Sequence, residues 1–244
     1  MIAALPWYDL PEVAGALDAF WSRWAGAIGV SVGLTRARGC YEIAAAPDLL
    51  VTQVCGVAIG GLEVVGTPVF EVPGCRGPLY SSHVVVRSGE RLRDGLRAAA
   101  NDPRSWSGYH VLRTLGLRFR SVDVTGAHTA SVDAVRSGRA DVAAIDAVTW
   151  ALLERWRPGA LRGLSIVGCT ELAPAPPWVS RGRAVRLRAG LGTAISGARP
   201  EEREGTRLVG WELLGPGAYG ELVARAAGLP PLWAAEPVRR LSPG

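Results

Sequence analysis

Two serines and a glycine at the start of a predicted helix are the residues of this sequence best suited to hold a ligand. Ser105, Ser107 and Gly108 precede an apolar helix face that begins at Val111. Hydroxyls and unobstructed backbone N–H groups at a helix start attract an anion, because the N–H groups and the helix dipole both favour negative charge. The alternative is that Ser107 is an ordinary N-cap with no ligand.

Three more polar side chains lie at the carboxyl ends of predicted strands, the edge at which open α/β sheets bind ligands. Tyr8 follows the first predicted strand, and Gln53 lies at the end of a buried strand over residues 49–54. Asp146 follows a strand over residues 141–145 and is expected to cap the next helix. Tyr8 has the alternative role of covering the edge of the core, and Asp146 that of a plain N-cap.

The segment 118–155 alternates strand and helix, which requires a parallel sheet with right-handed crossovers. After a strand at 118–125, Thr129 is expected to cap a helix that ends before Gly138. The strand at 141–145 and a second helix follow. These elements place candidate binding residues at helix starts and strand ends.

The remaining elements surround this segment on both sides. Asp9 and Glu12 fit a capping box for a helix that continues to about Ala27. Further strands are expected over residues 2–5, 63–70, 80–87 and 164–169, and further helices over 184–195 and 219–227.

Two β/α lobes joined by short, hinge-like segments are the organisation that these elements favour. The chain crosses between the lobes near Tyr80–Arg87 and again near Cys169–Ser180. We therefore expect a discontinuous lobe one made of residues 1–84 and 173–244, and a lobe two made of residues 85–172.

Composition limits the classes of partner. All 27 basic residues are arginine, and the net charge of +5 favours anionic ligands. The densest group, Arg181, Arg183, Arg186 and Arg188, has no interleaved aromatic residues, so nucleic-acid binding is not expected. No apolar run reaches about 18 residues, so membrane insertion is not expected either.

Residues 2–5 are too short for a signal sequence, so we expect a periplasmic location if a leader has been removed and a cytoplasmic one if Met1 is the native start.

The sequence has no pattern for a metal, a cofactor or a nucleophile. Its four cysteines, at positions 40, 55, 75 and 169, form no CxxC pair, so no metal site is expected. Cys55 and Cys75 follow neighbouring predicted strands, and both a disulfide and two buried thiols are compatible with that placement. Nucleophile motifs and a G-x-G-x-x-G fingerprint are missing, so we expect no catalytic residue and no cofactor.

Six segments resemble a known family. They are ALPWYD at 4–9, LLVTQVCG at 49–56, VGTPVFEVPGC at 65–75, LYSSHVVVR at 79–87, SWSG at 105–108 and GAHTASVDAVRSGRADVAAIDAVTW at 126–150. With them the sequence resembles the type II periplasmic substrate-binding proteins of phosphate, phosphite and phosphonate ABC transporters. The resemblance implies an α/β fold of two lobes, each a mostly parallel sheet flanked by helices, with two hinge crossings.

The resemblance also implies roles for several residues. In that family a Ser/Thr-Ser-Gly turn holds phosphoryl oxygens, and Ser105, Ser107 and Gly108 match it. Trp106 stands at the middle position, where a hydroxyl residue often occurs. His128 matches the family's histidine at the next helix start, and its alternative role is that of a cap or structural donor.

Other matched positions concern the cleft and the kind of ligand. Tyr8, Gln53 and Tyr80 match cleft-lining positions, and Asp146 is placed to accept a hydrogen bond from a protonated ligand oxygen. Thr129 stands where relatives that bind aminoalkyl phosphonates have an acidic residue. This favours phosphate, phosphite or a simple phosphonate over a ligand with a cationic tail.

The resulting hypothesis is capture of a small anion in an inter-lobe cleft, without chemistry, by a monomer that serves an ABC-transporter permease. Two alternatives stay open at this point. The same fold serves some cytoplasmic enzymes, including menaquinone-pathway dehydratases and lyases, and it would also suit a cytosolic ligand sensor.

Overall fold

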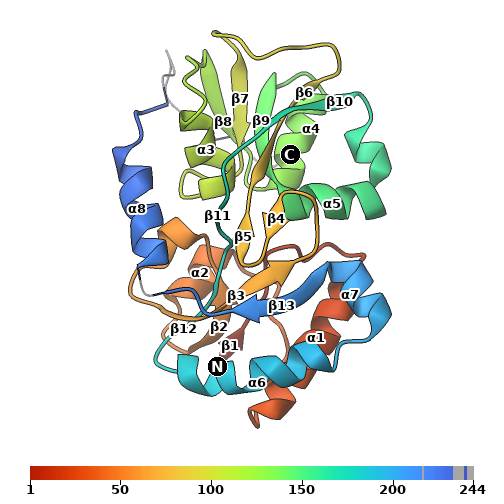
Figure 1. The fold of residues 1–244 in the computed structure, drawn as a ribbon, viewed down its shortest axis with the longest axis vertical. Helices are drawn as coiled ribbons and strands as arrows, with labels where there is room; N and C mark the ends of the chain where they lie inside the picture. Colours follow the sequence, from red (N-terminus) through yellow and green to blue (C-terminus); the bar gives the residue numbers. More distant parts are fainter. Residues whose placement is uncertain (216, 233–238, 241–244) are drawn as a thin grey trace. The chain divides into compact units, whose positions relative to one another are not determined.

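The computed structural model describes residues 1–215, 217–232 and 239–240. Its contacts divide the chain into two compact units, each built from a sheet and helices (Figure 1). Unit 1 comprises Met1–Leu79 and Pro174–Gly220, and unit 2 comprises Tyr80–Ala173 and the described residues from Glu221 onward.

Unit 1 is a five-stranded sheet in the order β1-β2-β12-β3-β13 with helices packed on it. Its strands are β1 (Ile2–Ala3), β2 (Leu49–Gln53), β3 (Glu63–Phe70), β12 (Trp178–Ser180) and β13 (Leu208–Glu212). Its helices are α1 (Ala14–Ala27), α2 (Cys40–Ala45), α6 (Ala184–Ser196) and α7 (Pro200–Thr206).

Most strand pairs of unit 1 are antiparallel, which differs from the mostly parallel sheet expected for each half. Strand β1 pairs parallel with β2, but β12 lies between β2 and β3 and runs antiparallel to both. Strand β13 is also antiparallel to β3. The reason is the chain path: β12 and β13 belong to the part of the chain that returns after unit 2, and they enter the sheet in the opposite direction.

Helix α1 lies against α6 (Figure 1). Aromatic side chains fix it there and against the sheet. Trp24 is completely buried, and its indole N–H donates to the Leu187 carbonyl of α6 at 2.7 Å. The Trp24 ring meets Trp178 of β12 at 5.4 Å between centroids, and Phe20 stacks on Trp178 at 5.7 Å. Phe20 and Trp24 are four residues apart, so they lie on one face of α1 and bury it together.

Unit 2 is a six-stranded sheet in the order β10-β6-β9-β7-β8-β14. Its strands are β6 (Ser82–Arg87), β7 (Arg97–Ala100), β8 (Ser121–Val124), β9 (Val142–Asp146), β10 (Leu164–Cys169) and β14 (Arg239–Arg240). Its helices are α3 (Val111–Arg113), α4 (His128–Arg136) and α5 (Ala147–Trp156), and a π-helical segment at Trp106–His110 leads into α3.

The centre of the unit 2 sheet is parallel, as the strand–helix alternation predicted. Strand β7 pairs parallel with β8 on one side and with β9 on the other. All residues of β9 are buried, and its Ala143 and Ile145 belong to a core cluster with residues of α4 and α5, among them Val132 and Leu153. The carboxyl ends of β7, β8 and β9 consequently meet at one edge of this sheet.

Two short strands mark the places where the chain passes from one unit to the other. They are β5 (Leu79–Tyr80) and β11 (Ala173–Pro174), which form a small sheet with β4 (Cys75–Arg76). Both crossings therefore lie close to the expected ones. Cys75 is half-buried and Cys55 is buried, and no disulfide joins them.

The C-terminal region differs from the expected division, which grouped residues 173–244 with the N-terminal part. Helix α8 (Ala218–Gly228) begins in unit 1, and from Glu221 its residues pack with unit 2. Arg113 explains this, because its guanidinium donates to the backbone carbonyls of Ala226, Leu229 and Pro230. That the two units behave as separate domains stays a prediction.

Two predicted helix caps are wrong. Val13 is the N-cap of α1 and makes no side-chain cap, while Asp9 instead binds Arg36 through a 2.6 Å ion pair. Helix α4 begins at His128 after the extended residue Ala127, so Thr129 lies inside its first turn and does not cap it. In both cases the chain enters the helix at a residue other than the expected polar one.

Candidate functional site

The turn predicted to hold an anion lies just beyond the carboxyl end of β7. Ser105 is its N-cap, and the Ser105 Oγ accepts a hydrogen bond from the Gly108 N–H at 3.1 Å. The N–H groups of Tyr109 and His110 both donate to the Ser105 carbonyl. The expectation of an unobstructed Gly108 N–H is therefore wrong, whereas the Ser107 N–H makes no hydrogen bond within the described part of the chain.

The hydroxyls of this turn meet the histidine at the start of α4. The Ser107 Oγ lies 3.0 Å from the His128 Nε2 and 3.4 Å from the Ser105 Oγ. All three side chains are buried. Burial lowers the pKa of His128, against the opposing effects of the Asp146 carboxylate and the Ala144 carbonyl, so the imidazole is neutral at physiological pH.

Asp146 supports this histidine from the end of β9. The side chain caps α5 as predicted: its Oδ1 accepts from the Thr149 N–H at 2.8 Å, and its Oδ2 accepts from the Thr149 hydroxyl at 2.6 Å. The same Oδ2 lies 3.3 Å from the His128 Nε2. Both carboxylate oxygens therefore already have donors, and the expected contact of Asp146 with a ligand stays a prediction.

The serine, histidine and aspartate do not have the geometry of a proton relay. In a catalytic triad the serine and the carboxylate contact opposite nitrogens of the imidazole. Here the Ser107 Oγ and the Asp146 Oδ2 both lie next to Nε2. The arrangement fixes the orientation of the Ser107 hydroxyl and is suited to binding.

One residue at this edge was missed by the sequence analysis. Asn101 follows β7 directly and is only 8 % exposed. A Cβ placed on Gly108 would lie 1.8 Å from the Asn101 Oδ1, so the asparagine packs closely on the glycine. Gln53 and Asp146 were predicted because each is a polar residue at the end of a strand. Asn101 meets the same criterion and could have been predicted in the same way.

The other predicted residues have varied surroundings. Trp106 is buried, stacks with His110 and lies under the Arg225 guanidinium, which is 5.0 Å from the ring centroid. Tyr80 is 1 % exposed and is the first residue of unit 2. Thr129 is half-buried in the first turn of α4.

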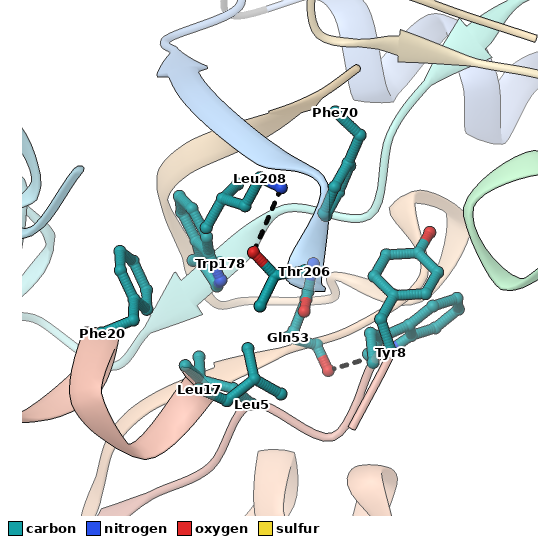
Figure 2. A pocket seen from close by; sticks show the side chains of 10 residues that line it. Leu5, Tyr8, Leu17, Phe20, Gln53, Phe70, Trp178, Thr206 and Leu208 are labelled. Carbon is teal, nitrogen blue, oxygen red and sulfur yellow. Dashed lines mark hydrogen bonds between the residues drawn. The ribbon is translucent and has the colours of Figure 1, made fainter. Parts of the chain in front are cut away.

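Tyr8 and Gln53 belong to unit 1, where they line a mostly apolar cavity (Figure 2). The cavity volume is about 20 Å³, which is room for about one water molecule. Tyr8 has a left-handed φ of 66° and makes an edge contact with Phe70. The Gln53 Nε2 donates to the Pro176 carbonyl at 2.9 Å, so this amide holds the returning chain in place.

The described residues contain no group of three or more histidine, cysteine, aspartate or glutamate side chains that could hold a metal ion. Within the same residues, no helix has both the length and the apolar character needed to cross a membrane.

Known structures share this fold. A binding protein component of an ABC phosphonate transporter from Pseudomonas aeruginosa superposes with a TM-score of 0.69 at 15 % identity, covering 92 % of this chain and 93 % of that one. PhnD1 from Prochlorococcus marinus, solved in complex with methylphosphonate, gives 0.69 at 15 % identity and covers 88 % and 92 %. XAC2383 from Xanthomonas citri, bound to chloride ion, gives 0.70 at 18 % identity and covers 93 % and 97 %. At these identities the likeness shows the fold alone.

Sequence comparison identifies the family. No curated protein sequence matches the chain significantly. The profile of the family described as "ABC transporter, phosphonate, periplasmic substrate-binding protein" matches residues 67–212, more than half of the chain, and this range includes the turn, His128 and Asp146. The fold is accordingly that of the type II periplasmic binding proteins, as the resemblance implied. The chain belongs to the phosphonate-binding periplasmic substrate-binding proteins of ABC transporters.

Proposed function

We propose that this protein captures a small phosphate-like oxyanion, namely phosphate, phosphite or a simple phosphonate, and delivers it to an ABC-transporter permease without chemical turnover. The observation that carries the proposal is the contact between the Ser105–Gly108 turn and His128. It gathers hydroxyl groups and a backbone N–H beside a neutral imidazole.

The donors of this turn suit a compact anion. The Ser105 Oγ accepts from Gly108, which leaves its own proton for a ligand or for the Ser107 Oγ. The His128 Nε2–H can donate to the Ser107 Oγ, which in turn leaves the Ser107 proton for a ligand. Together with the Ser107 N–H, the turn offers three donors. A hydrogen bond to a charged group contributes about 1.5–3 kcal/mol.

The first turn of α4 argues against a ligand with an ammonium group. It contains no acidic residue, and Thr129 follows His128 directly. A buried ammonium without a carboxylate partner is costly. A simple phosphonate needs no such partner, and methylphosphonate is the molecule bound in the PhnD1 structure that shares this fold.

Several finer points are part of the proposal. We propose that Tyr8, Gln53 and Tyr80 contribute to ligand binding, that Trp106 shapes the site, and that the protein acts as a monomer outside the cytoplasm.

Removal of the two hydroxyls tests the proposal. In a Ser105→Ala/Ser107→Ala double variant, titration calorimetry with methylphosphonate should show at least a hundredfold weaker binding, because two charge-assisted hydrogen bonds are lost. The matched control is Ser88→Ala/Ser165→Ala, which removes another pair of serines of unit 2 whose Oγ atoms are 3.0 Å apart. The control should bind like the wild type. Equal affinity of both double variants would exclude this turn as the site.

A further inference from the structure

We infer that Asn101 contacts the ligand and selects an oxyanion that still carries a proton. The inference rests on the proposed function and adds to it a residue and a protonation state. It depends on one buried acceptor atom, the Asn101 Oδ1, which lies against Gly108 just beyond the end of β7.

The position of Asn101 is fixed by its backbone. The residue follows the last residue of β7, and its carbonyl accepts a hydrogen bond from the Gly126 N–H at 2.9 Å. This bond ties the end of β7 to the loop that leads into α4. The asparagine is thereby held between the two segments that carry Ser107 and His128.

The side-chain oxygen of Asn101 is buried without a donor. Within the described part of the chain, no hydrogen bond reaches its Oδ1, and the residue is more than nine-tenths buried. An unsatisfied buried acceptor destabilises the fold, so such an atom needs a partner that the protein itself does not supply.

The neighbours of Gly108 show where this oxygen points. A Cβ on Gly108 would meet the Asn101 Oδ1 at 1.8 Å and the His128 Cε1 at 3.2 Å. The Asn101 Oδ1 and the imidazole ring of His128 therefore both lie on the same side of Gly108. Because glycine has no side chain, the turn leaves room there for the amide oxygen.

An acceptor in this place changes what the site can recognise. Ser105 and Ser107 offer hydroxyl protons to unprotonated ligand oxygens. With the amide in the orientation that the structure shows, the Asn101 Oδ1 is an acceptor, so it pairs with a P–OH group and would repel a fully deprotonated oxygen. A site built around a buried polar group disfavours analogues that leave this group unpaired. Monoprotonated phosphonate or phosphate fits, and sulfate, which has no proton at neutral pH, does not.

The test measures selectivity as well as affinity. Methylphosphonate and sulfate are titrated into the wild type and into Asn101→Ala at pH 6, at which methylphosphonate still carries one proton and sulfate carries none. The wild type should bind methylphosphonate at least tenfold more tightly than sulfate. Asn101→Ala should weaken the binding of methylphosphonate about tenfold, as expected for one lost hydrogen bond, and the binding of sulfate less than twofold.

The outcomes separate this inference from the proposed function. If the wild type binds neither methylphosphonate nor phosphate or phosphite titrated in the same way, the proposed function is wrong and the inference is lost with it. If the wild type binds methylphosphonate but prefers it less than tenfold over sulfate, Asn101 does not select a protonated ligand, and this comparison needs no variant. Unchanged methylphosphonate affinity in a folded Asn101→Ala protein, or an equal loss for both anions, would also overturn the inference while leaving the proposed function intact.

Discussion

At the scale of single residues, the candidate site depends on side chains that hold one another in place. Asp146 accepts two hydrogen bonds from Thr149 and lies 3.3 Å from the His128 Nε2, which in turn lies 3.0 Å from the Ser107 Oγ. Each link is buried, so the orientation of the Ser107 hydroxyl is set before any ligand arrives. Such preorganisation reduces the entropy lost on binding.

Gly108 gives a prediction at this scale. In Gly108→Ala the new Cβ would come within 1.8 Å of the Asn101 Oδ1, so the turn or the asparagine must move. We expect the free energy of unfolding to fall by about 1–3 kcal/mol, which is the usual cost of overpacking, as measured by urea denaturation.

The matched control for this substitution is Gly159→Ala. Gly159 is exposed in unit 2, and a Cβ there would meet nothing within 4 Å. Its substitution should change stability by less than about 1 kcal/mol. Equal stability of the two variants would contradict the close packing of Asn101 on Gly108.

Sequence patterns predicted some of these residues and missed others for identifiable reasons. Asp146 does cap the helix that follows it, because a cap acts on residues only three positions away. The cap of the 106–110 segment is Ser105 and not Ser107, the residue that the sequence offered as an N-cap. The position of Asn101 depends on a contact with Gly108, which lies on the far side of a turn. Whether Thr129 caps α4 depends on where the extended loop ends, and it ends at Ala127. Neither is encoded in local spacing.

At the scale of elements, the two ends of the parallel strands in the unit 2 sheet carry different residues. The carboxyl ends of β7 and β9 carry Asn101 and Asp146. At the opposite edge, Asp141 precedes β9 and binds the guanidinium groups of Arg97 and Arg87 at 2.7 Å and 3.0 Å. This ion-pair cluster joins the start of β7 and the residue before β9 to the end of the antiparallel strand β6.

The ion-pair cluster predicts a pH dependence of stability. The hydrogen bond from Arg97, with further help from Arg87, holds the pKa of Asp141 far below its usual range. A carboxyl group with a lowered pKa stabilises the fold above its unfolded pKa of about 3.9, and this contribution is lost as the pH falls through the folded value.

We therefore expect Asp141→Asn to destabilise the protein by about 1–3 kcal/mol at pH 7. The difference from the wild type should shrink as the pH is lowered from 5 towards 2, as followed by urea denaturation. Asp133→Asn is the control, because Asp133 is an exposed partner of Arg136 and should contribute less than about 0.5 kcal/mol. A difference that grows on acidification would contradict the role given to Asp141.

Long periodic elements were predictable, and short or non-local ones were not. Strand β3 occupies the predicted range 63–70, and α6 and α8 begin within one residue of the expected starts. Helices α2 and α7, with six and seven residues, are too short to show a period and were missed. The antiparallel position of β12 depends on the path of the returning chain, which spacing does not reveal.

At the scale of the whole molecule, the chain passes between its two units three times. Two passages occur at the short strands β5 and β11, and the third occurs within α8. The end of α8 is held on unit 2 by Arg113 and by the ion pair between Arg225 and Glu171. The family places the molecule among proteins that pass a bound solute to a transporter, and the proposed anion site lies on unit 2.

Nuclear magnetic resonance of the ¹⁵N-labelled protein, titrated with methylphosphonate, tests the central claim most directly. We predict saturable shifts that are largest for the backbone amides of Ser107 and Gly108 and for those at the start of α4, around His128. Absence of shifts at these amides while others saturate, or no saturable shift anywhere in the spectrum, would contradict the claim that this turn binds the anion.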